Sequence, residues 1–259
     1  MLKKIFFCIT ILSFIACSSD SEENNGNGTT PTNPMVANQQ AVGSSANDIL
    51  SDDTYTRLSV EIVYVQGFEP SQTAVNNFTT FLQQRTFKPD GITTTLTAID
   101  PPGNTSYTIA DIVALEETHR MNYNTENEVV IWAFFADAPS SSNTETGVVL
   151  GTAYRNTSFV IYEQTIQELS DEPFEPNRNI LETTVITHEF GHLLGLTNLG
   201  TPLQSDHEDA EHPKHCDVDT CLMFWSAETG AGISNMVSGG SAPQLDAQCI
   251  ADLQANGGR

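Results

Sequence analysis

The sequence predicts an α/β fold in which helices pack against one twisted, mixed sheet of five strands. From residue 57 onward, strand-like and helical patterns follow in the order strand, helix, strand, helix, three strands, helix. The segment 128–135 is an uninterrupted apolar run, which is typical of a central strand covered on both faces. Because no internal repeat or second linker interrupts residues 56–259, we expect one domain with one core.

Each predicted element depends on the spacing of its apolar side chains. The first strand alternates apolar and polar residues, the first helix places Val75, Phe78 and Leu82 on one face, and the second strand is rich in threonine. The predicted strands are 58–65, 92–99, 128–135, 148–154 and 158–164, with a turn near Asn156 between the last two. The predicted helices are 71–87, 109–121, one from about 179 to 195, and a final one at 244–253.

Residues 1–17 have the pattern of a secretion signal, because two lysines precede an apolar run at 5–16 that is too short for a permanent membrane span. Residues 13–17 (Ser-Phe-Ile-Ala-Cys) resemble a bacterial lipobox, in which the cysteine is lipidated and becomes the mature N-terminus. We therefore expect a lipoprotein of the cell envelope, anchored to the outer membrane or cell surface through Cys17. A plain signal peptide cleaved near Ala16 is the alternative.

Residues 18–55 are rich in Ser, Asn, Gly, Thr, Pro and Gln and poor in large apolar residues. Such a composition predicts a disordered polar tether, followed by a folded domain at 56–259. The formal net charge of the chain is −23. Nucleic acid is therefore excluded as an expected partner, because its phosphates would be repelled.

The motif that indicates a reaction is His188-Glu189-Phe190-Gly191-His192. On a helix, this HExxH spacing places the two imidazoles one turn apart on one face, where both can bind one metal ion, with Glu189 beside a metal-bound water. Zinc lowers the pKa of such a water from about 16 towards about 7, and a carboxylate can take its proton as it attacks a carbonyl. This pattern predicts peptide-bond hydrolysis.

Capping signals in the sequence mark both ends of the helix that contains this motif. Asn179 with Glu182 three residues later suits an N-terminal cap, and Gly195 suits a left-handed residue at the C-terminal end. Ile186 and Phe190 belong to an apolar stripe that is separate from the histidine face. One face is therefore expected in the core and the other at a metal.

The segment 188–195 resembles the metzincin metallopeptidases, whose motif HExxHxxGxxH supplies a third histidine three residues after the glycine. This chain matches through Gly195 and has Asn198 in place of that histidine. Further on, 215–223 (His-Cys-Asp-Val-Asp-Thr-Cys-Leu-Met) resembles the archaemetzincin segment in which the third ligand precedes Cys-x4-Cys-x-Met. The match covers the site region and the order of elements.

The resemblance implies a zincin-like fold, zinc as cofactor, and a small C-terminal subdomain with a methionine turn and the final helix. It implies that His215 is the third zinc ligand and that Met223 lies in the turn beneath the metal. Residues 197–214 are then a loop inserted between the glycine turn and His215, and 147–154 is the edge strand that binds the substrate.

The inserted loop contains other candidate ligands, because a catalytic zinc needs three protein ligands of nitrogen, sulfur or oxygen. His207 is the main alternative to His215, followed by His212. Glu208 or Glu211 would give a site completed by a carboxylate. The residue types alone leave this choice open.

Three cysteines remain after the predicted signal and lipid site: Cys216, Cys221 and Cys249. In an oxidising compartment two of them can pair, and Cys249 could join either of the others. The chain has no later Cys-x-x-Cys to complete the second zinc site of archaemetzincins. The resemblance therefore implies a disulfide between Cys216 and Cys221 instead of metal ligation.

These patterns predict a zinc-dependent peptidase, an endopeptidase in particular, that acts on peptides or proteins with Glu189 as general base. The chemistry requires no organic cofactor. The alternative is a non-catalytic surface binding lipoprotein that keeps the fold and uses zinc structurally. A hydrolase of non-peptide amides would use the same zinc-dependent mechanism and is a further possible function class.

Overall fold

The computed structural model describes residues 34–145, 147–170, 175–227 and 240–259. The predicted signal segment, Cys17 and the first part of the predicted tether lie outside the described residues.

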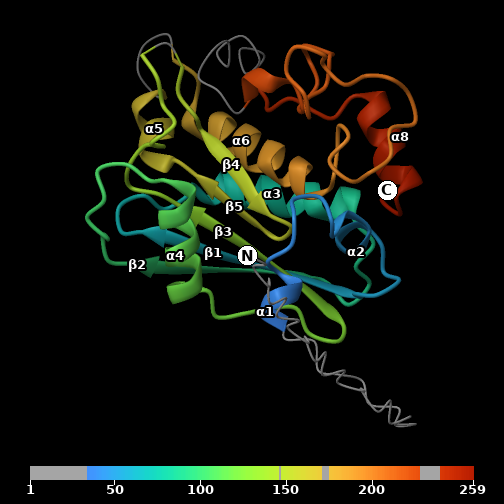
Figure 1. The fold of residues 1–259 in the computed structure, drawn as a ribbon, viewed down its shortest axis with the longest axis horizontal. Coiled ribbons are helices and arrows are strands. Elements are labelled where there is room, and N and C mark those ends of the chain that lie inside the picture. Colours follow the sequence, from blue (N-terminus) through green and yellow to red (C-terminus); the bar gives the residue numbers. More distant parts are fainter. Residues whose placement is uncertain (1–33, 146, 171–174, 228–239) are drawn as a thin grey trace, which may run out of the picture. The chain divides into compact units, whose positions relative to one another are not determined.

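A five-stranded mixed sheet forms the centre of the fold (Figure 1). Its strands are β2 (Ile92–Ile99), β1 (Arg57–Val65), β3 (Glu128–Phe135), β5 (Ser158–Ile161) and β4 (Gly151–Arg155), in that spatial order. The first four run parallel, and β4 pairs antiparallel with β5 at the edge. The predicted α/β class with a mixed five-stranded sheet is therefore confirmed.

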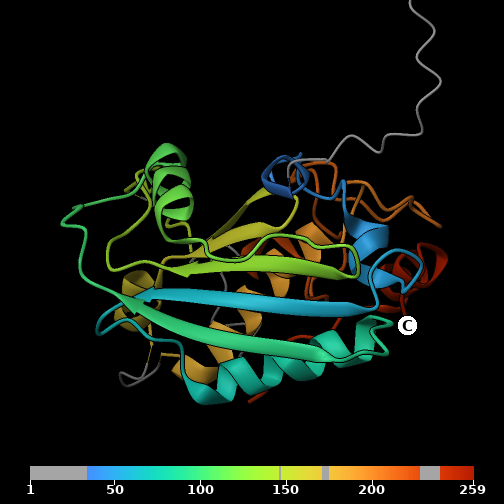
Figure 2. The same cartoon turned by 90° about the horizontal axis from the view of Figure 1, so that it is seen from below.

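Helices cover both faces of the sheet. Helices α3 (Gln72–Arg85) and α6 (Arg178–Leu193) share one apolar core with one face, and α4 (Ile109–His119) shares a second core with the other. Figure 2 shows α3 and α4 on opposite sides of the sheet. Helix α8 (Ala247–Ala255) adds Cys249 and Leu253 to the first core.

Among the described residues, no helix has both the length and the apolar character needed to cross a bilayer.

The N-terminal part of the domain begins earlier than the sequence predicts. Residues 34–55 include α1 (Pro34–Ala37) and α2 (Ala46–Leu50), and the side chains of Ile49 and Leu50 are fully buried in the first core. The predicted boundary between tether and domain at residue 55 is therefore wrong. Two apolar residues and a few amide side chains are enough to fix this segment, although its composition is polar.

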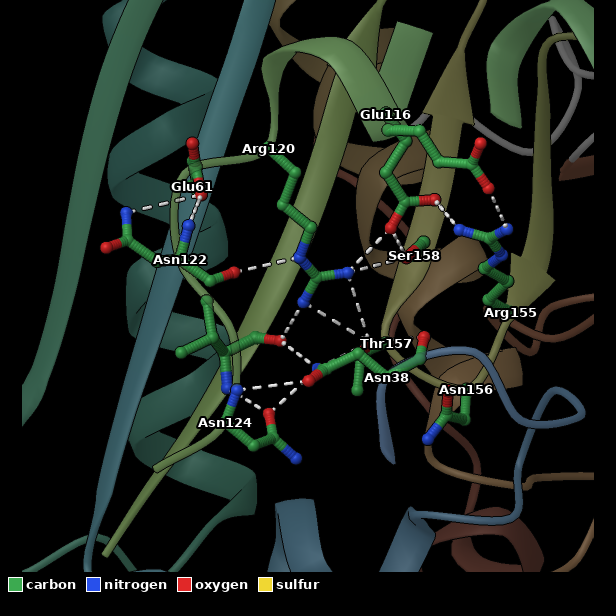
Figure 3. A network of polar contacts seen from close by, with 12 residues as sticks. Asn38, Glu61, Glu116, Arg120, Asn122, Asn124, Arg155, Asn156, Thr157 and Ser158 are labelled. Atoms are coloured by element: carbon green, nitrogen blue, oxygen red, sulfur yellow. Dashed lines mark hydrogen bonds and ion pairs between the residues drawn. The ribbon is translucent and has the colours of Figure 1, made fainter. Parts of the chain in front are cut away.

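A buried polar network holds the N-terminal segment to the sheet (Figure 3). The fully buried amide of Asn38 donates to Asn124 Oδ1 at 2.8 Å, to the Val130 carbonyl at 3.2 Å and to Thr157 Oγ1 at 3.0 Å. Asn124 N returns a hydrogen bond to Asn38 Oδ1 at 3.0 Å. Buried amides that are fully bonded in this way fix a unique position for the segment.

Three charged residues extend the same network. Arg120 pairs with Glu116 at 2.6 Å, and its guanidinium also donates to the Val130 carbonyl at 2.8 Å. The second oxygen of Glu116 accepts from Arg155 at 2.9 Å. The buried charges are thus compensated, as such charges must be to avoid a large desolvation cost.

Two local predictions need correction. The last predicted strand ends at Ile161, and the residues after it form a short helix, α5 (Glu163–Glu168). The cap of α6 is Asn177, whose side chain accepts from the backbone N–H of Asn179, so Asn179 is already helical. Burial, and after it the charge of Glu182, together raise the pKa of Glu163 to about 9.

Replacing Asn38 tests how strongly the N-terminal segment is built into the fold. Asn38→Ala leaves its buried partners without a donor, so we expect the free energy of unfolding to fall by about 1–3 kcal/mol. Chemical denaturation measures this change. The control is Asn76→Ala, at an exposed helix position where the side chain accepts from Gln72, with an expected change within about 0.5 kcal/mol. Equal effects of the two variants would contradict the role given to Asn38.

Candidate active site

Helix α6 carries the HExxH motif through the middle of the first core. Three of its threonines lie on the buried part of the helix, and each hydroxyl donates to the carbonyl four residues earlier, as in Thr187 to Thr183 at 2.7 Å. Phe190 packs edge-on against Phe78 with ring centroids 5.1 Å apart. The apolar side of the helix is therefore fixed, and its other side presents the histidines to the cleft.

Three histidine side chains converge beside α6. One ring nitrogen from each of His188, His192 and His215 lies within 4.8 Å of the other two, and all three residues are buried. The ring centroids are 4.8 to 5.4 Å apart. Three imidazoles at this spacing match the ligand set of a catalytic zinc.

Backbone carbonyls orient two of these rings. His188 Nδ1 lies 2.7 Å from the Leu222 carbonyl, and His215 Nδ1 lies 3.2 Å from the Pro213 carbonyl. Because a carbonyl can only accept, each Nδ1 carries the proton and each Nε2 keeps its lone pair for a metal. The residues present therefore fit a zinc ion by their chemistry, spacing and tautomers.

Glu189 lies between the histidines and the edge strand β4. Its Oε2 accepts from the backbone N–H of Ala153 at 2.8 Å. A Cβ at Gly151 would lie 2.6 Å from Glu189 Cγ, so only glycine lets the strand approach this closely. The carboxylate is thus held at a fixed place beside the strand.

A cleft of about 220 Å³ opens beside these residues. Residues of four segments line it: Val42, Thr152, Ala153, Glu189, His192, Leu199, Lys214 and His215. Val42 belongs to the segment predicted to be tether, so its place in the wall could not be read from the sequence. Burial raises the pKa of nearby Tyr162, and the charge of Glu189 raises it further.

Met223 packs directly beneath the histidine helix. It is fully buried, and a Cβ at Gly191 would lie 2.3 Å from its sulfur. Gly195 adopts a φ of 71°, as predicted for the turn after the helix. The turn that contains Met223 and the glycine of the motif therefore fit each other closely.

The other candidate ligands lie elsewhere. His207 forms a 2.8 Å contact with Asp252, and His212 stacks on Trp225 with centroids 4.3 Å apart. Asn198 is exposed and donates to Glu208 at 3.0 Å. The structure thus brings His215, and not His207, to the two histidines of the helix.

The predicted disulfide between Cys216 and Cys221 is absent, because all three described cysteines are free thiols. The sulfurs of Cys221 and Cys249 lie 3.6 Å apart. That separation is far longer than the roughly 2.05 Å of a disulfide bond.

Comparisons with known proteins find similarity by structure and not by sequence. No family model matches the chain, and no curated protein matches it. Among solved structures, the chain is similar to an archaemetzincin. That protein is from Methanopyrus kandleri, with 17% sequence identity and a TM-score of 0.49. The match to this archaemetzincin covers 78% of this chain and 96% of that one.

The contact between Gly191 and Met223 yields a prediction. Gly191→Ala adds a methyl group where the Met223 sulfur already lies, so overpacking is expected to lower the free energy of unfolding by about 1–3 kcal/mol. Thermal and chemical denaturation measure it. Gly147→Ala is the matched control, because its added Cβ would have Thr144 Oγ1 at an ordinary 3.6 Å as its neighbour. A Gly191→Ala protein as stable as the control would disprove the close fit.

Proposed function

We propose that this chain is a zinc-dependent endopeptidase of the metzincin type. His188, His192 and His215 hold the zinc ion, and Glu189 is the general base. The observation that carries the proposal is the convergence of three imidazole nitrogens within 4.8 Å, beside a cleft lined by Glu189, His192 and His215.

When bound, zinc supplies an acidified water and polarises the scissile carbonyl. Glu189 would accept a proton from the water that attacks the scissile carbonyl carbon and, as the C–N bond breaks, donate it to the leaving amine. Its hydrogen bond from Ala153 keeps the carboxylate in place during both transfers. Met223 and the Leu222 carbonyl fix the position of the helix and of His188.

The edge strand β4 supports a peptide as the substrate. It lies at the end of the sheet, paired with β5 on one side. An extended peptide can add to such an edge through main-chain hydrogen bonds, with its side chains directed alternately away from and towards the cleft. Val42, Leu199 and Lys214 also line the cleft. We expect these three side chains to set any preference for particular substrate side chains.

The expected location is the cell envelope. A lipid on Cys17 would anchor the chain, and the acidic surface would remain in the extracytoplasmic space. An open cleft beside a buried carboxylate argues against a binding lipoprotein with purely structural zinc, because a structural site is closed by a fourth ligand.

The first test is cleavage of a mixed-sequence peptide library, with new termini identified by mass spectrometry. Glu189→Gln keeps the shape of the side chain but cannot accept the proton, so the rate is expected to fall by roughly 10²–10⁴-fold with zinc retained. Glu211→Gln, at an exposed loop position, is the control and should keep the rate. Bound zinc without cleavage by the unmodified protein would support the binding lipoprotein instead.

A second test identifies the third ligand. His215→Ala removes one of three imidazoles and is expected to weaken zinc binding at this site by at least about 10-fold, measured by competition with a chelator. His212→Ala is the matched control, because that ring stacks on Trp225 and contacts Asp209 instead. The assignment fails if the two substitutions weaken zinc binding equally.

A further inference from the structure

One basic side chain lies in the wall of the cleft beside the three histidines. Lys214 lines this cleft together with Glu189, His192 and His215, and no other described residue that lines it is a lysine or an arginine. The chain as a whole is acidic, with 10 lysines and arginines against 33 aspartates and glutamates. The positive charge in the cleft is therefore a local feature and does not reflect a basic surface.

Contacts of its backbone fix the position of Lys214. Its N–H donates to Glu208 Oε1 at 2.8 Å, and its carbonyl accepts a hydrogen bond from the Thr197 hydroxyl. The next residue, His215, is buried and has a ring nitrogen within 4.8 Å of those of the other two histidines. Lys214 is therefore held beside the site by contacts that leave its side chain uncommitted.

Lys214 also has a backbone conformation that favours glycine. Its φ is 72°, in the left-handed region that residues with a Cβ seldom adopt. Such conformations cost free energy, persist where the surrounding structure enforces them, and are concentrated at functional sites. The loop thus keeps a lysine where a glycine would fit the backbone better, and this lysine faces the cleft.

The Lys214 ammonium is available to a group that enters the cleft. The residue is exposed, and no carboxylate of the described part of the chain forms an ion pair with it. The neighbouring Glu208 accepts from the Lys214 backbone N–H with one oxygen and from Asn198 with the other. An ammonium group has donors but no acceptor, so its complement in a ligand is an acceptor, preferably an anion.

In a peptide, the anions are the carboxylates of aspartate, glutamate and the C-terminus. A bond inside a chain is far from the C-terminus, so an acidic side chain is the carboxylate that a peptide in the cleft can supply. Val42 and Leu199 in the same wall suit the methylene groups of such a side chain. The net charge of −23 repels acidic peptides from a distance, but salt screens this repulsion beyond about 8 Å. Contact with Lys214 therefore decides the preference.

We propose that Lys214 makes the cleft selective for peptides with an aspartate or glutamate side chain beside the bond that is cleaved. This inference rests on the proposed peptidase function and names its substrate class. The ammonium donates a charge-assisted hydrogen bond to the substrate carboxylate. Lys214 is thus a specificity-determining residue, and it takes no part in the proton transfers of Glu189.

The first test uses the zinc-loaded full-length protein and a mixed-sequence library of peptides with amidated C-termini. New termini read by mass spectrometry are expected to show aspartate and glutamate enriched at one position beside the cleaved bond. Two peptides that differ there by glutamate or glutamine are then compared. The expected ratio of their kcat/KM values is roughly 5 to 15, between the effects of an exposed ion pair and a buried charged hydrogen bond. Equal values overturn the proposal.

Substitutions connect this ratio to Lys214. Lys214→Met keeps the length of the side chain without its charge and is expected to bring the ratio to about one, whereas Lys214→Arg keeps a preference for glutamate and Lys214→Glu reverses it. Arg57→Met, at an exposed position in β1 outside the cleft, removes the same charge from the chain and should keep the ratio. If Lys214→Met slows both peptides by the same factor, the residue serves catalysis and the proposal fails.

Salt dependence gives a measurement on the unmodified protein, independent of how the variants fold. Raising the ionic strength from about 0.1 M to about 1 M shortens the Debye length from about 10 Å to about 3 Å. The glutamate-to-glutamine ratio is expected to fall towards one, and a constant ratio contradicts an ion pair. Cleavage that occurs only in peptides with a free C-terminus assigns Lys214 to the terminal carboxylate and also overturns the selectivity for acidic side chains.

Binding separates this inference from the proposed function. If the unmodified protein cleaves no peptide, the proposed function fails, and the same library is passed over the immobilised zinc-loaded protein and over Lys214→Met. Retained peptides that are richer in aspartate and glutamate on the unmodified protein than on the variant support recognition by Lys214. Equal compositions, or no retention by either protein, overturn it.

Discussion

The hydrogen bond between His188 Nδ1 and the Leu222 carbonyl is the interaction on which the site depends. It joins the helix of the HExxH motif to a segment far along the chain, at 2.7 Å, and it sets the tautomer of the first histidine. The next residue, Met223, fills the space that Gly191 leaves open. The helix and the turn are thus held together by one polar and one apolar contact. Both contacts are needed to position the three histidines.

Periodic patterns explain which parts of this arrangement could be predicted from the sequence. The apolar spacing of α3, the continuous apolar run of β3 and the HExxH spacing each reflect a local repeat, and each corresponds to an observed element. The edge position of β4 also agrees with the expectation from the resemblance. Short elements such as α5 have too few residues for a repeat, and the prediction extended the preceding strand through its first residues.

The third histidine could not be chosen from composition, because its position depends on the path of the inserted loop. That path turns at Thr197 and Lys214, two residues other than glycine with left-handed φ values of 51° and 72°. A hydrogen bond from the Thr197 hydroxyl to the Lys214 carbonyl closes the loop immediately before His215. Such conformations are uncommon for these residue types and leave no signal in the sequence.

The cysteines and the N-terminal segment were predicted wrongly for a related reason. A disulfide between Cys216 and Cys221 was expected because no later Cys-x-x-Cys follows in the sequence, but Cys249 and His207 come close to Cys216 in the folded chain. Similarly, Asn38 contributes to the polar composition that predicted a tether. Its burial depends on acceptors at Val130 in β3 and at Thr157, directly before β5. Contacts between distant segments decide both cases.

The N-terminal segment also restricts which residues the turn after the histidine helix can contain. Gly43 and Gly200 lie against each other, and a Cβ at Gly43 would meet the Leu199 carbonyl oxygen at 1.7 Å, while one at Gly200 would meet the Gly43 carbonyl oxygen at 2.6 Å. Both residues have left-handed φ values, of 78° and 136°. Neither position can accept a side chain while the other stays in place. The segment before the first strand and the turn after the histidine helix are therefore sterically coupled, so that a side chain introduced on either one would have to displace the backbone of the other.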